Sequence, residues 1–211
     1  EREMAGSVRW GILATGWIAE QFVKDLNQHG HQVTAVGSRS QASADRFAAE
    51  FGIPKAHGSY EALCADANVD AIYIATPHPM HADNAKLVLS HGKHVLIEKA
   101  FTVNAREAQE IVDLGASRGL VVLEAMWTRF LPHMLRIREI VRSGVLGEIR
   151  SVVADHTQDL PDDPKHRLNA LELGGGALLD LGIYPISFTF DVLGVPKTIA
   201  ATARLKDTGA D

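Results

Sequence analysis

The sequence predicts a protein of the α/β class whose first part is a doubly wound parallel sheet. Over the first 125 residues, apolar runs of strand length alternate with amphipathic stretches at helical spacing. The connections between them are short, and strand–helix–strand units with short connections cross over in the right-handed sense and give parallel strands. Of the 211 residues, 46% are hydrophobic and 22% are charged, which is the balance of a globular protein with a buried core.

Charge, hydropathy and cysteine content argue against several function classes. The net charge of −5 offers no basic surface for nucleic acid. No apolar run reaches membrane-spanning length and the first residues lack a signal-peptide pattern, so we expect no membrane partner. Cys64 is the only cysteine, so we expect neither a disulfide framework nor a thiolate metal cluster, and we expect a cytoplasmic location.

The first strand, turn and helix form the stretch around which the chain is organised. The apolar run 8–13 leads into a turn of small residues and then into an amphipathic helix over residues 17–26. The pattern G-x-G-x-x-A, with alanine in its first position, lies on residues 14–19. Such a turn lets a pyrophosphate approach the N–H groups and the positive end of the helix.

This unit predicts a Rossmann domain that binds a dinucleotide. The alternative is a strand–helix turn without a ligand, which doubly wound folds also contain. The residues expected to contact the cofactor here are Ala14, Thr15, Gly16, Trp17 and Ile18.

The end of the second predicted strand, residues 31–37, bears on the choice of cofactor. A dinucleotide fold places an acidic residue near this point to bind the ribose hydroxyls of NAD, and this chain has Ser38 and Arg39 instead. A hydroxyl and a guanidinium suit a ribose 2′-phosphate, so we expect NADP, with NAD less favoured. The alternative is an exposed arginine that merely follows a strand.

The remaining elements of the first domain follow in alternation. Apolar spacing, the helix N-cap Asn104 and the stop signals Gly52, Pro54 and Gly92 predict where they begin and end. We expect helices at 42–51, 59–66, 82–90 and 104–117, and strands at 55–57, 70–76, 94–97 and 120–125.

Two strand ends carry further candidate residues. The strand 70–76 ends in a proline-pinned loop that suits contact with a flat ring, because ligands of parallel sheets bind beyond the carboxyl ends of the strands. Its expected cofactor contacts are Thr76, Pro77, His78 and His81. The two histidines also suit a metal ion, but we expect no metal site, since the rest of a ligand shell is not evident in the sequence.

Lys99 follows the strand 94–97 and therefore falls at the same sheet edge as the first turn. A lysine after a strand is often simply solvated. A lysine at the mouth of a cleft can instead act as an acid–base group or as a hydrogen-bond donor.

The pattern changes near residue 125, so we expect domains at 1–125 and 126–211. The second domain is predicted to contain helices at 132–142 and 177–193 and strands at 147–156 and from 198 to 205; the first of these strands alternates in the manner of an antiparallel strand. Asp180 and Tyr184 are four residues apart and share a helix face, while Pro185 is expected to disturb that helix. A carboxylate and a phenol on an apolar helix suggest a functional site, although a locally hydrogen-bonded tyrosine explains the pattern too.

Four motifs carry a resemblance to a known family. They are IATPHPMH at 74–81, GKHVLIEKA at 92–100, EAMWTRFLPH at 124–133 and LGGGALLDLGIYPI at 173–186. With them the chain resembles the glucose–fructose oxidoreductase / inositol dehydrogenase (Gfo/Idh/MocA) family, in the branch of the dimeric dihydrodiol dehydrogenases and NADP-dependent sugar dehydrogenases. The resemblance implies a Rossmann domain followed by an α/β domain with an open antiparallel sheet. That sheet often forms the subunit interface, which implies a homodimer or a higher oligomer.

The resemblance also implies roles for individual residues. Lys99, Asp180 and Tyr184 match the catalytic positions, and Glu98, Trp127 and Arg129 match positions at the cofactor. The chain departs from the family where Ala14 replaces a glycine and Ala100 replaces a proline, and the second domain is expected to be incomplete because family members are longer.

The resulting functional prediction is an NADP-dependent oxidoreductase that moves a hydride between the nicotinamide and a secondary alcohol carbon of a sugar, polyol or cyclic diol. Tyr184 would be the general acid–base, with Lys99 favouring loss of its proton and Asp180 orienting the substrate; whether Lys99 or Tyr184 moves the proton stays open. The alternative is a non-catalytic nucleotide-binding sensor on the same fold.

Overall fold

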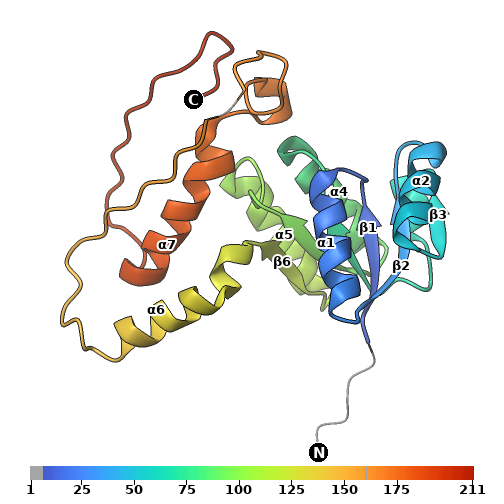
Figure 1. The fold of residues 1–211 in the computed structure, drawn as a ribbon, viewed down its shortest axis with the longest axis horizontal. Helices are drawn as coiled ribbons and strands as arrows, with labels where there is room; N and C mark the ends of the chain where they lie inside the picture. The colour runs from blue at the N-terminus through green and yellow to red at the C-terminus, as the bar shows by residue number, and fades with distance from the viewer. Residues whose placement is uncertain (1–6, 160) are drawn as a thin grey trace, which may run out of the picture. The chain divides into compact units, whose positions relative to one another are not determined.

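A computed structural model describes residues 7–159 and 161–211 of the chain (Figure 1). The chain divides into two compact units, one ending at Ala125 and one beginning at Met126.

The first unit is built on one sheet of six strands in the order β3-β2-β1-β4-β5-β6, and every neighbouring pair is parallel. This is the doubly wound order of dinucleotide-binding folds, and it confirms the predicted fold class. The strands are β1 (Arg9–Leu13), β2 (Gln32–Gly37), β3 (Lys55–His57), β4 (Ala71–Ile74), β5 (His94–Glu98) and β6 (Val122–Ala125). The helices are α1 (Trp17–Gln28), α2 (Gln41–Phe51), α3 (Tyr60–Cys64), α4 (His81–Ser90) and α5 (Ala105–Ser117).

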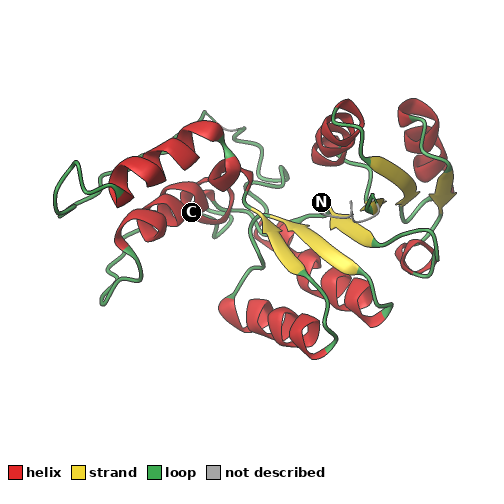
Figure 2. Ribbon diagram, turned by 90° about the horizontal axis from the view of Figure 1, so that it is seen from below, coloured by secondary structure: helices red, strands yellow, loops and turns green. Residues whose placement is uncertain are grey.

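Helices cover both faces of this sheet (Figure 2). Successive strand residues point to opposite faces, so Ile12 and Tyr73 join one core while Leu13 and Ile72 join the other. The core of Ile12 also takes buried residues of α1 and α2, and the core of Leu13 takes residues of α3, α4 and α5. The winding therefore reverses between β1 and β4, which is where ligands bind in such sheets.

Close packing of α3 against β2 depends on Gly37, because a Cβ at this residue would lie 2.8 Å from Cβ of Leu63. The neighbouring Cys64 is fully buried, and burial raises the pKa of its thiol to about 12. The thiol is therefore un-ionised and inert in the folded state.

A buried carboxylate ties β3 to the loop that precedes β4. Asp66 accepts hydrogen bonds from Lys55 Nζ at 3.3 Å and from the Asn68 amide at 2.8 Å, and its Oδ2 lies 3.0 Å from Nε2 of His57. Burial alone would raise the pKa of Asp66, but these hydrogen bonds outweigh burial and lower it to about 2.

The regular elements of the second unit are all helical among the described residues. Its elements are the 3₁₀ turns η2 (Trp127–Phe130) and η3 (Leu171–Leu173), the π-helical turn η4 (Leu178–Gly182), and the helices α6 (Pro132–Arg142) and α7 (Ile183–Leu193). The helix predicted over 177–193 is thus a π turn followed by an α-helix. Pro185 lies just after the π turn, inside a helical run that began at Ala177, so the disturbance expected from it coincides with the change from π to α geometry.

The strands expected at 147–156 and 198–205, and with them the open antiparallel sheet, do not form among the described residues of this unit. Both segments run as long loops (Figure 1). A strand requires a hydrogen-bonded neighbour along its edge, and residues 147–156 have none in the described chain. Alternating hydropathy predicts a side-chain pattern but cannot supply that partner.

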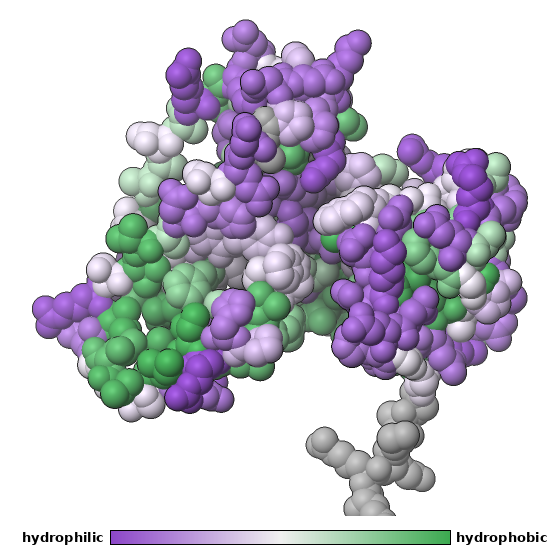
Figure 3. All heavy atoms as spheres, in the orientation of Figure 1, coloured by the Kyte–Doolittle hydropathy of each residue, from purple (hydrophilic) through white to green (hydrophobic). Residues whose placement is uncertain are grey.

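The second unit exposes many apolar side chains, which gather around α7 and the end of α6 (Figure 3). They include Val145, Leu146, Leu178, Ile186, Phe190, Leu193 and Ile199. By length and composition alone, the segment Leu171–Leu193 is apolar enough to cross a membrane, with a mean hydropathy of 1.3 in its most apolar window, although the sequence predicted no such run. In the structure this segment comprises η3, η4 and α7, and residues 174–176 between η3 and η4 are not helical.

Candidate functional site

The turn after β1 leaves the N-terminus of α1 open. Gly16 is the N-cap residue of α1, and no side chain caps the helix. A Cβ built on Gly16 would meet no atom within 4 Å, so space for a ligand lies directly above the turn. Glycine at this position lets a phosphate approach the free N–H groups and the positive end of the helix. The turn therefore fits the pyrophosphate of a dinucleotide.

Ala14 shows why the family has glycine at the first motif position. Its φ is +88°, in the region that side chains with a Cβ disfavour, and its N–H donates to the carbonyl oxygen of Gly37 at 2.9 Å. The chain keeps the backbone shape of the motif without the glycine. The methyl group therefore adds conformational strain to the turn.

The end of β2 places Arg39 at the surface of the same sheet edge. Ser38 is buried, and its Oγ accepts the N–H of Ser40 at 3.4 Å, whereas Arg39 is exposed. No side chain caps α2, which begins just after these residues. Tyr60 is a neighbour that the sequence did not indicate: burial raises the pKa of its phenol, and the charge of Arg39 acts in the opposite direction. Arg39 is therefore a cation beside an open helix N-terminus, which suits a phosphate.

The loop after β4 is pinned by His81. This side chain is fully buried, with Nδ1 at 2.9 Å from the carbonyl oxygen of Ala100 and Nε2 at 2.7 Å from that of Thr76. Burial lowers the pKa of His81 although both carbonyls favour its protonated form. Its ring therefore links two loops. Pro77 remains exposed, and Thr76 and His78 are largely buried.

The turn of Lys99 is held by side chains from neighbouring elements. The carbonyl oxygen of Ala100 faces His81, and the N–H of Phe101 donates to Oε1 of Glu124 at 2.9 Å. Lys99 itself is half-buried, and its N–H donates to Oε2 of Glu98 at 3.2 Å. These contacts stabilise the turn at the position where the family has a proline.

Parallel strands end at one edge of the sheet, so four candidate groups of the first unit share that edge. The Gly16 turn follows β1, Arg39 follows β2, Thr76 follows β4 and Lys99 follows β5, and these four strands are contiguous in the sheet. The edge thus combines an open helix N-terminus, a guanidinium and an amine.

In the second unit, the structure gives Tyr184 two aromatic neighbours. Trp127 Nε1–H donates a hydrogen bond to the phenol oxygen at 3.1 Å. The ring of His156 stacks on the phenol with 5.1 Å between centroids and an interplanar angle of 21°. The motifs indicated Trp127, but His156 lies in the segment predicted as a strand and only folding brings it to Tyr184.

The other two candidates of the second unit are ion-paired. Asp180 is 6% exposed and accepts a hydrogen bond from Arg167 Nη1 at 3.3 Å. Arg129 Nη2 lies 3.6 Å from Oδ1 of Asp191 on α7. Arg167 was not predicted, because a lone arginine in a polar loop carries no motif. Arg167 therefore orients the Asp180 carboxyl.

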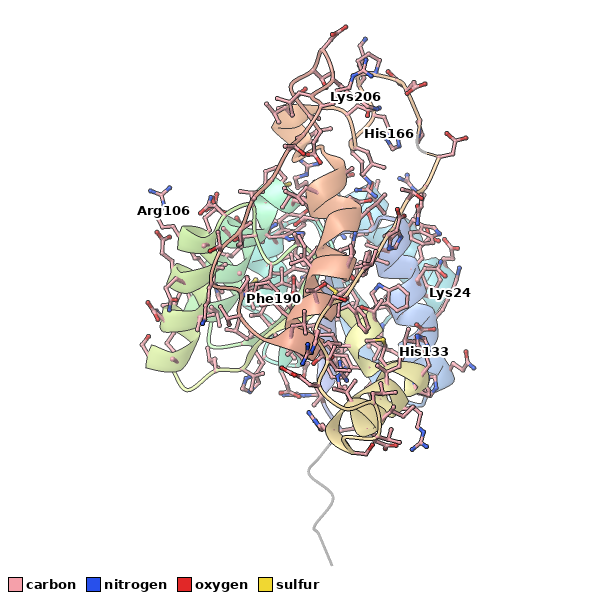
Figure 4. All side chains as sticks on the ribbon, turned by 90° about the vertical axis from the view of Figure 1, so that its left-hand side faces the viewer. Lys24, Arg106, His133, His166, Phe190 and Lys206 are labelled. Carbon is pink, nitrogen blue, oxygen red and sulfur yellow. The ribbon has the colours of Figure 1, made fainter. Side chains whose placement is uncertain are left out.

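A hollow of ≈ 420 Å³ lies beside Tyr184, between η2, α6, α7 and residues 154–156. Its wall includes Arg129, His133, His156, Tyr184 and Asp191, and Figure 4 shows the labelled His133 on α6 and Phe190 on α7. The volume is in the range of small-molecule sites.

The chain matches family models over most of its length. A model described as "Oxidoreductase family, NAD-binding Rossmann fold" (GFO_IDH_MocA) matches residues 8–126, and the GFO/IDH/MocA C-terminal domain matches residues 134–211.

Individual relatives agree with these matches. The chain is 42% identical to trans-1,2-dihydrobenzene-1,2-diol dehydrogenase from Mus musculus over 97% of this chain and 62% of that protein. It is 38% identical to D-xylose 1-dehydrogenase (NADP(+)) from Hypocrea jecorina over 97% of this chain and 60% of that protein. Among solved structures, a 3-ketoreductase from Actinomadura kijaniata, in complex with NADP and TDP-benzene, has 34% identity and a TM-score of 0.81 over 90% of this chain and 58% of that one. The chain thus spans about three fifths of the length of the relatives that it matches.

Proposed function

We propose that this chain, which belongs to the GFO/IDH/MocA oxidoreductase family with its NAD-binding Rossmann fold, is an NADP-dependent dehydrogenase. Its substrate would be a secondary alcohol carbon of a sugar, polyol or cyclic diol. The observation that carries the proposal is the open N-terminus of α1 at the reversal point of the sheet, on the same edge as Lys99. Relatives named as dehydrogenases of dihydrodiol and xylose support the class of substrate.

The residues of the first unit fit a nicotinamide dinucleotide. The Ala14–Ile18 turn would bind the pyrophosphate, and Ser38 and Arg39 would bind a ribose 2′-phosphate, which favours NADP over NAD. Thr76, Pro77, His78, Glu98 and Lys99 would line the nicotinamide end, with His81 holding the loop behind them. When bound, this cofactor supplies or accepts the hydride.

Tyr184 is the proposed general acid–base. The indole N–H of Trp127 donates to its oxygen and so orients the phenol, whose hydroxyl would donate its proton to a substrate oxygen. When that proton leaves, the same N–H stabilises the charge that develops on the phenol oxygen. Lys99 would donate a hydrogen bond to the substrate oxygen, and Asp180, oriented by Arg167, would accept one from a substrate hydroxyl.

Assembly and location belong to the same proposal. The exposed apolar side chains around α7 support association into a homodimer or higher oligomer, because contiguous apolar surface is unfavourable in water. A reducing cytoplasm suits a chain whose only cysteine, Cys64, is buried and unpaired.

A second candidate is a nucleotide-binding sensor without turnover. The strained Ala14 and the absence of the expected sheet from the described second unit favour it. The ion pair that orients the buried Asp180 and the hydrogen-bond donor on Tyr184 argue for the dehydrogenase, since a pure binder needs neither.

The test is a panel of aldoses, polyols and dihydrodiols with NADP and with NAD, followed by the absorbance of the reduced nicotinamide. The dehydrogenase proposal expects turnover of at least one of these alcohols with NADP. Tight NADP binding without turnover of any member would favour the sensor, and an absence of binding would contradict both candidates.

A further inference from the structure

A buried phenol and a buried carboxyl lie next to the turn of Lys99. Tyr73, in β4, is 1% exposed, and Glu98, the last residue of β5, is 9% exposed. The Tyr73 hydroxyl donates a hydrogen bond to Oε1 of Glu98, with 2.5 Å between the oxygens. The other carboxyl oxygen accepts the N–H of Lys99 at 3.2 Å. Both oxygens of Glu98 are therefore engaged, one by β4 and one by the lysine backbone.

Packing fixes the phenol in this contact. The ring of Phe22, from α1, stacks on Tyr73 with 4.0 Å between centroids and an interplanar angle of 28°. Trp10 meets the edge of Phe22 at 5.5 Å between centroids. Rings held on a strand and a helix leave Tyr73 little rotational freedom, so its hydroxyl stays directed at Glu98.

The ionisation of Glu98 depends on its neighbours. The pKa of Glu98 is raised by burial, and the hydrogen bond from Tyr73 and the charge of Lys99 offset only part of that rise. The charge of Glu124, from β6, also raises the pKa of Glu98. Burial lowers the pKa of His81, from α4, and the charge of Lys99 lowers it further. Phe22, the residue of α1 stacked on Tyr73, brings no charge.

A structural role alone does not require a carboxylate here. A buried tyrosine hydroxyl is satisfied by a backbone carbonyl or an amide, at a lower desolvation cost than a charged group. We propose that Tyr73 is a positioning residue whose hydroxyl keeps the Glu98 carboxyl ionised and so holds a negative charge beside Lys99. The consequence for turnover rests on the proposed function: the ionised carboxyl accepts the backbone N–H of Lys99 more strongly than the neutral acid does, and so holds the turn that presents the Lys99 side chain to the substrate.

The direct test is a pH titration by NMR, with ¹³C-labelled glutamate carboxyls and ¹⁵N-labelled lysine amines in the purified protein. Spectra of Glu98→Gln and Lys99→Met assign the two signals. We expect the Glu98 titration midpoint to lie at higher pH in Tyr73→Phe than in the unaltered protein. The Lys99 signal should show a step at the same pH, which moves with Glu98 in Tyr73→Phe and disappears in Glu98→Gln. An unmoved midpoint or a Lys99 signal without that step would overturn the proposal.

Phe22→Leu is the matched control, because it loosens the packing of the same ring and leaves the hydroxyl. We expect it to lower the melting temperature without moving the Glu98 midpoint. A shift as large as that of Tyr73→Phe would assign the effect to packing and overturn the role of the hydroxyl.

Turnover supplies a separate measurement. In Tyr73→Phe the acidic limb of the pH profile of kcat should move to higher pH, and an unmoved limb would overturn the effect on the reaction. If the unaltered protein turns over no alcohol, the proposed function fails, while the two NMR titrations still decide whether Tyr73 governs Glu98.

Discussion

The indole of Trp127 donates a hydrogen bond to the phenol oxygen of Tyr184, 3.1 Å away. A donor to a tyrosine oxygen stabilises the negative charge that develops when the phenol gives up its proton, which favours the phenol as a general acid. Tyr184→Phe keeps the ring and its stacking on His156 and removes only the hydroxyl. We expect kcat to fall roughly 100- to 10,000-fold, with NADPH affinity unchanged. Steady-state kinetics and a fluorescence titration of NADPH measure the two quantities, and an unaltered kcat would remove Tyr184 from the mechanism.

Trp127→Phe tests the donor itself. The substitution retains an aromatic ring beside Tyr184 but removes the N–H that stabilises charge on the phenol oxygen. A hydrogen bond to a charged group contributes about 1.5–3 kcal/mol, so we expect kcat to fall roughly 10- to 100-fold. The double variant with Tyr184→Phe should lose no more than Tyr184→Phe alone. Additive losses would show that Trp127 acts independently of Tyr184.

The cofactor preference depends on Arg39, which is exposed at the end of β2 beside the uncapped start of α2. Arg39→Gln removes the charge that would bind the 2′-phosphate, so we expect NADPH to bind roughly 10- to 100-fold more weakly and NADH to be little affected. Arg46→Gln is the matched control, because Arg46 is an exposed arginine of α2 whose guanidinium donates a hydrogen bond to Ser43 of the same helix. Calorimetric titration with both nucleotides measures the two dissociation constants. Equal losses of affinity for NADPH and NADH would contradict the role of Arg39 in binding the 2′-phosphate.

Ala14 is expected to respond favourably to a glycine. At φ +88° a Cβ costs about 1–2 kcal/mol, and the greater freedom of glycine in the unfolded chain offsets part of this. We therefore expect Ala14→Gly to raise the free energy of unfolding by about 0.5–1 kcal/mol. Urea denaturation of the two proteins is the measurement, and a loss of stability would mean that the turn is not strained by its methyl group.

Acid stability is expected to depend on Asp66. Its folded-state pKa of about 2 lies below the ordinary value, so its contribution is present above about pH 4 and is lost as the pH falls toward 2. Asp66→Asn removes hydrogen bonds to a buried charge, and we expect a loss of about 2 kcal/mol at pH 7. The difference between the two proteins should shrink to near zero close to pH 2. Denaturation midpoints of both proteins at several pH values measure this difference. A difference that does not change with pH would contradict the role of the ionised Asp66 in stability.

The first unit was predictable because its signals are local. The apolar run before Ala14, the turn at Gly16 and the helix after it are contiguous in sequence, and short connections left only the parallel arrangement. The same order placed Arg39 and Lys99 at one sheet edge. Single contacts such as Tyr73 with Glu98 were not predictable, because they join positions 25 residues apart without a motif.

The second unit was less predictable because its signals need partners from elsewhere in the chain. Residues 147–156 alternate like a strand, but alternation does not provide the neighbouring strand that completes its hydrogen bonds. For the same reason, nothing in the sequence linked His156 to Tyr184 or Arg167 to Asp180. The motif did identify Tyr184 and Asp180, since the resemblance covers that helix.

The burial of Cys64 has a practical consequence. A thiol with a pKa of about 12 reacts with an alkylating reagent only when α3 opens and exposes it to water. Because the chain has one cysteine, the rate of its alkylation reports the opening of α3 with no label added. α3 packs on Gly37 of β2, and β2 leads to Arg39. The alkylation rate therefore measures whether a bound nucleotide stabilises the region where its adenosine end is expected to bind.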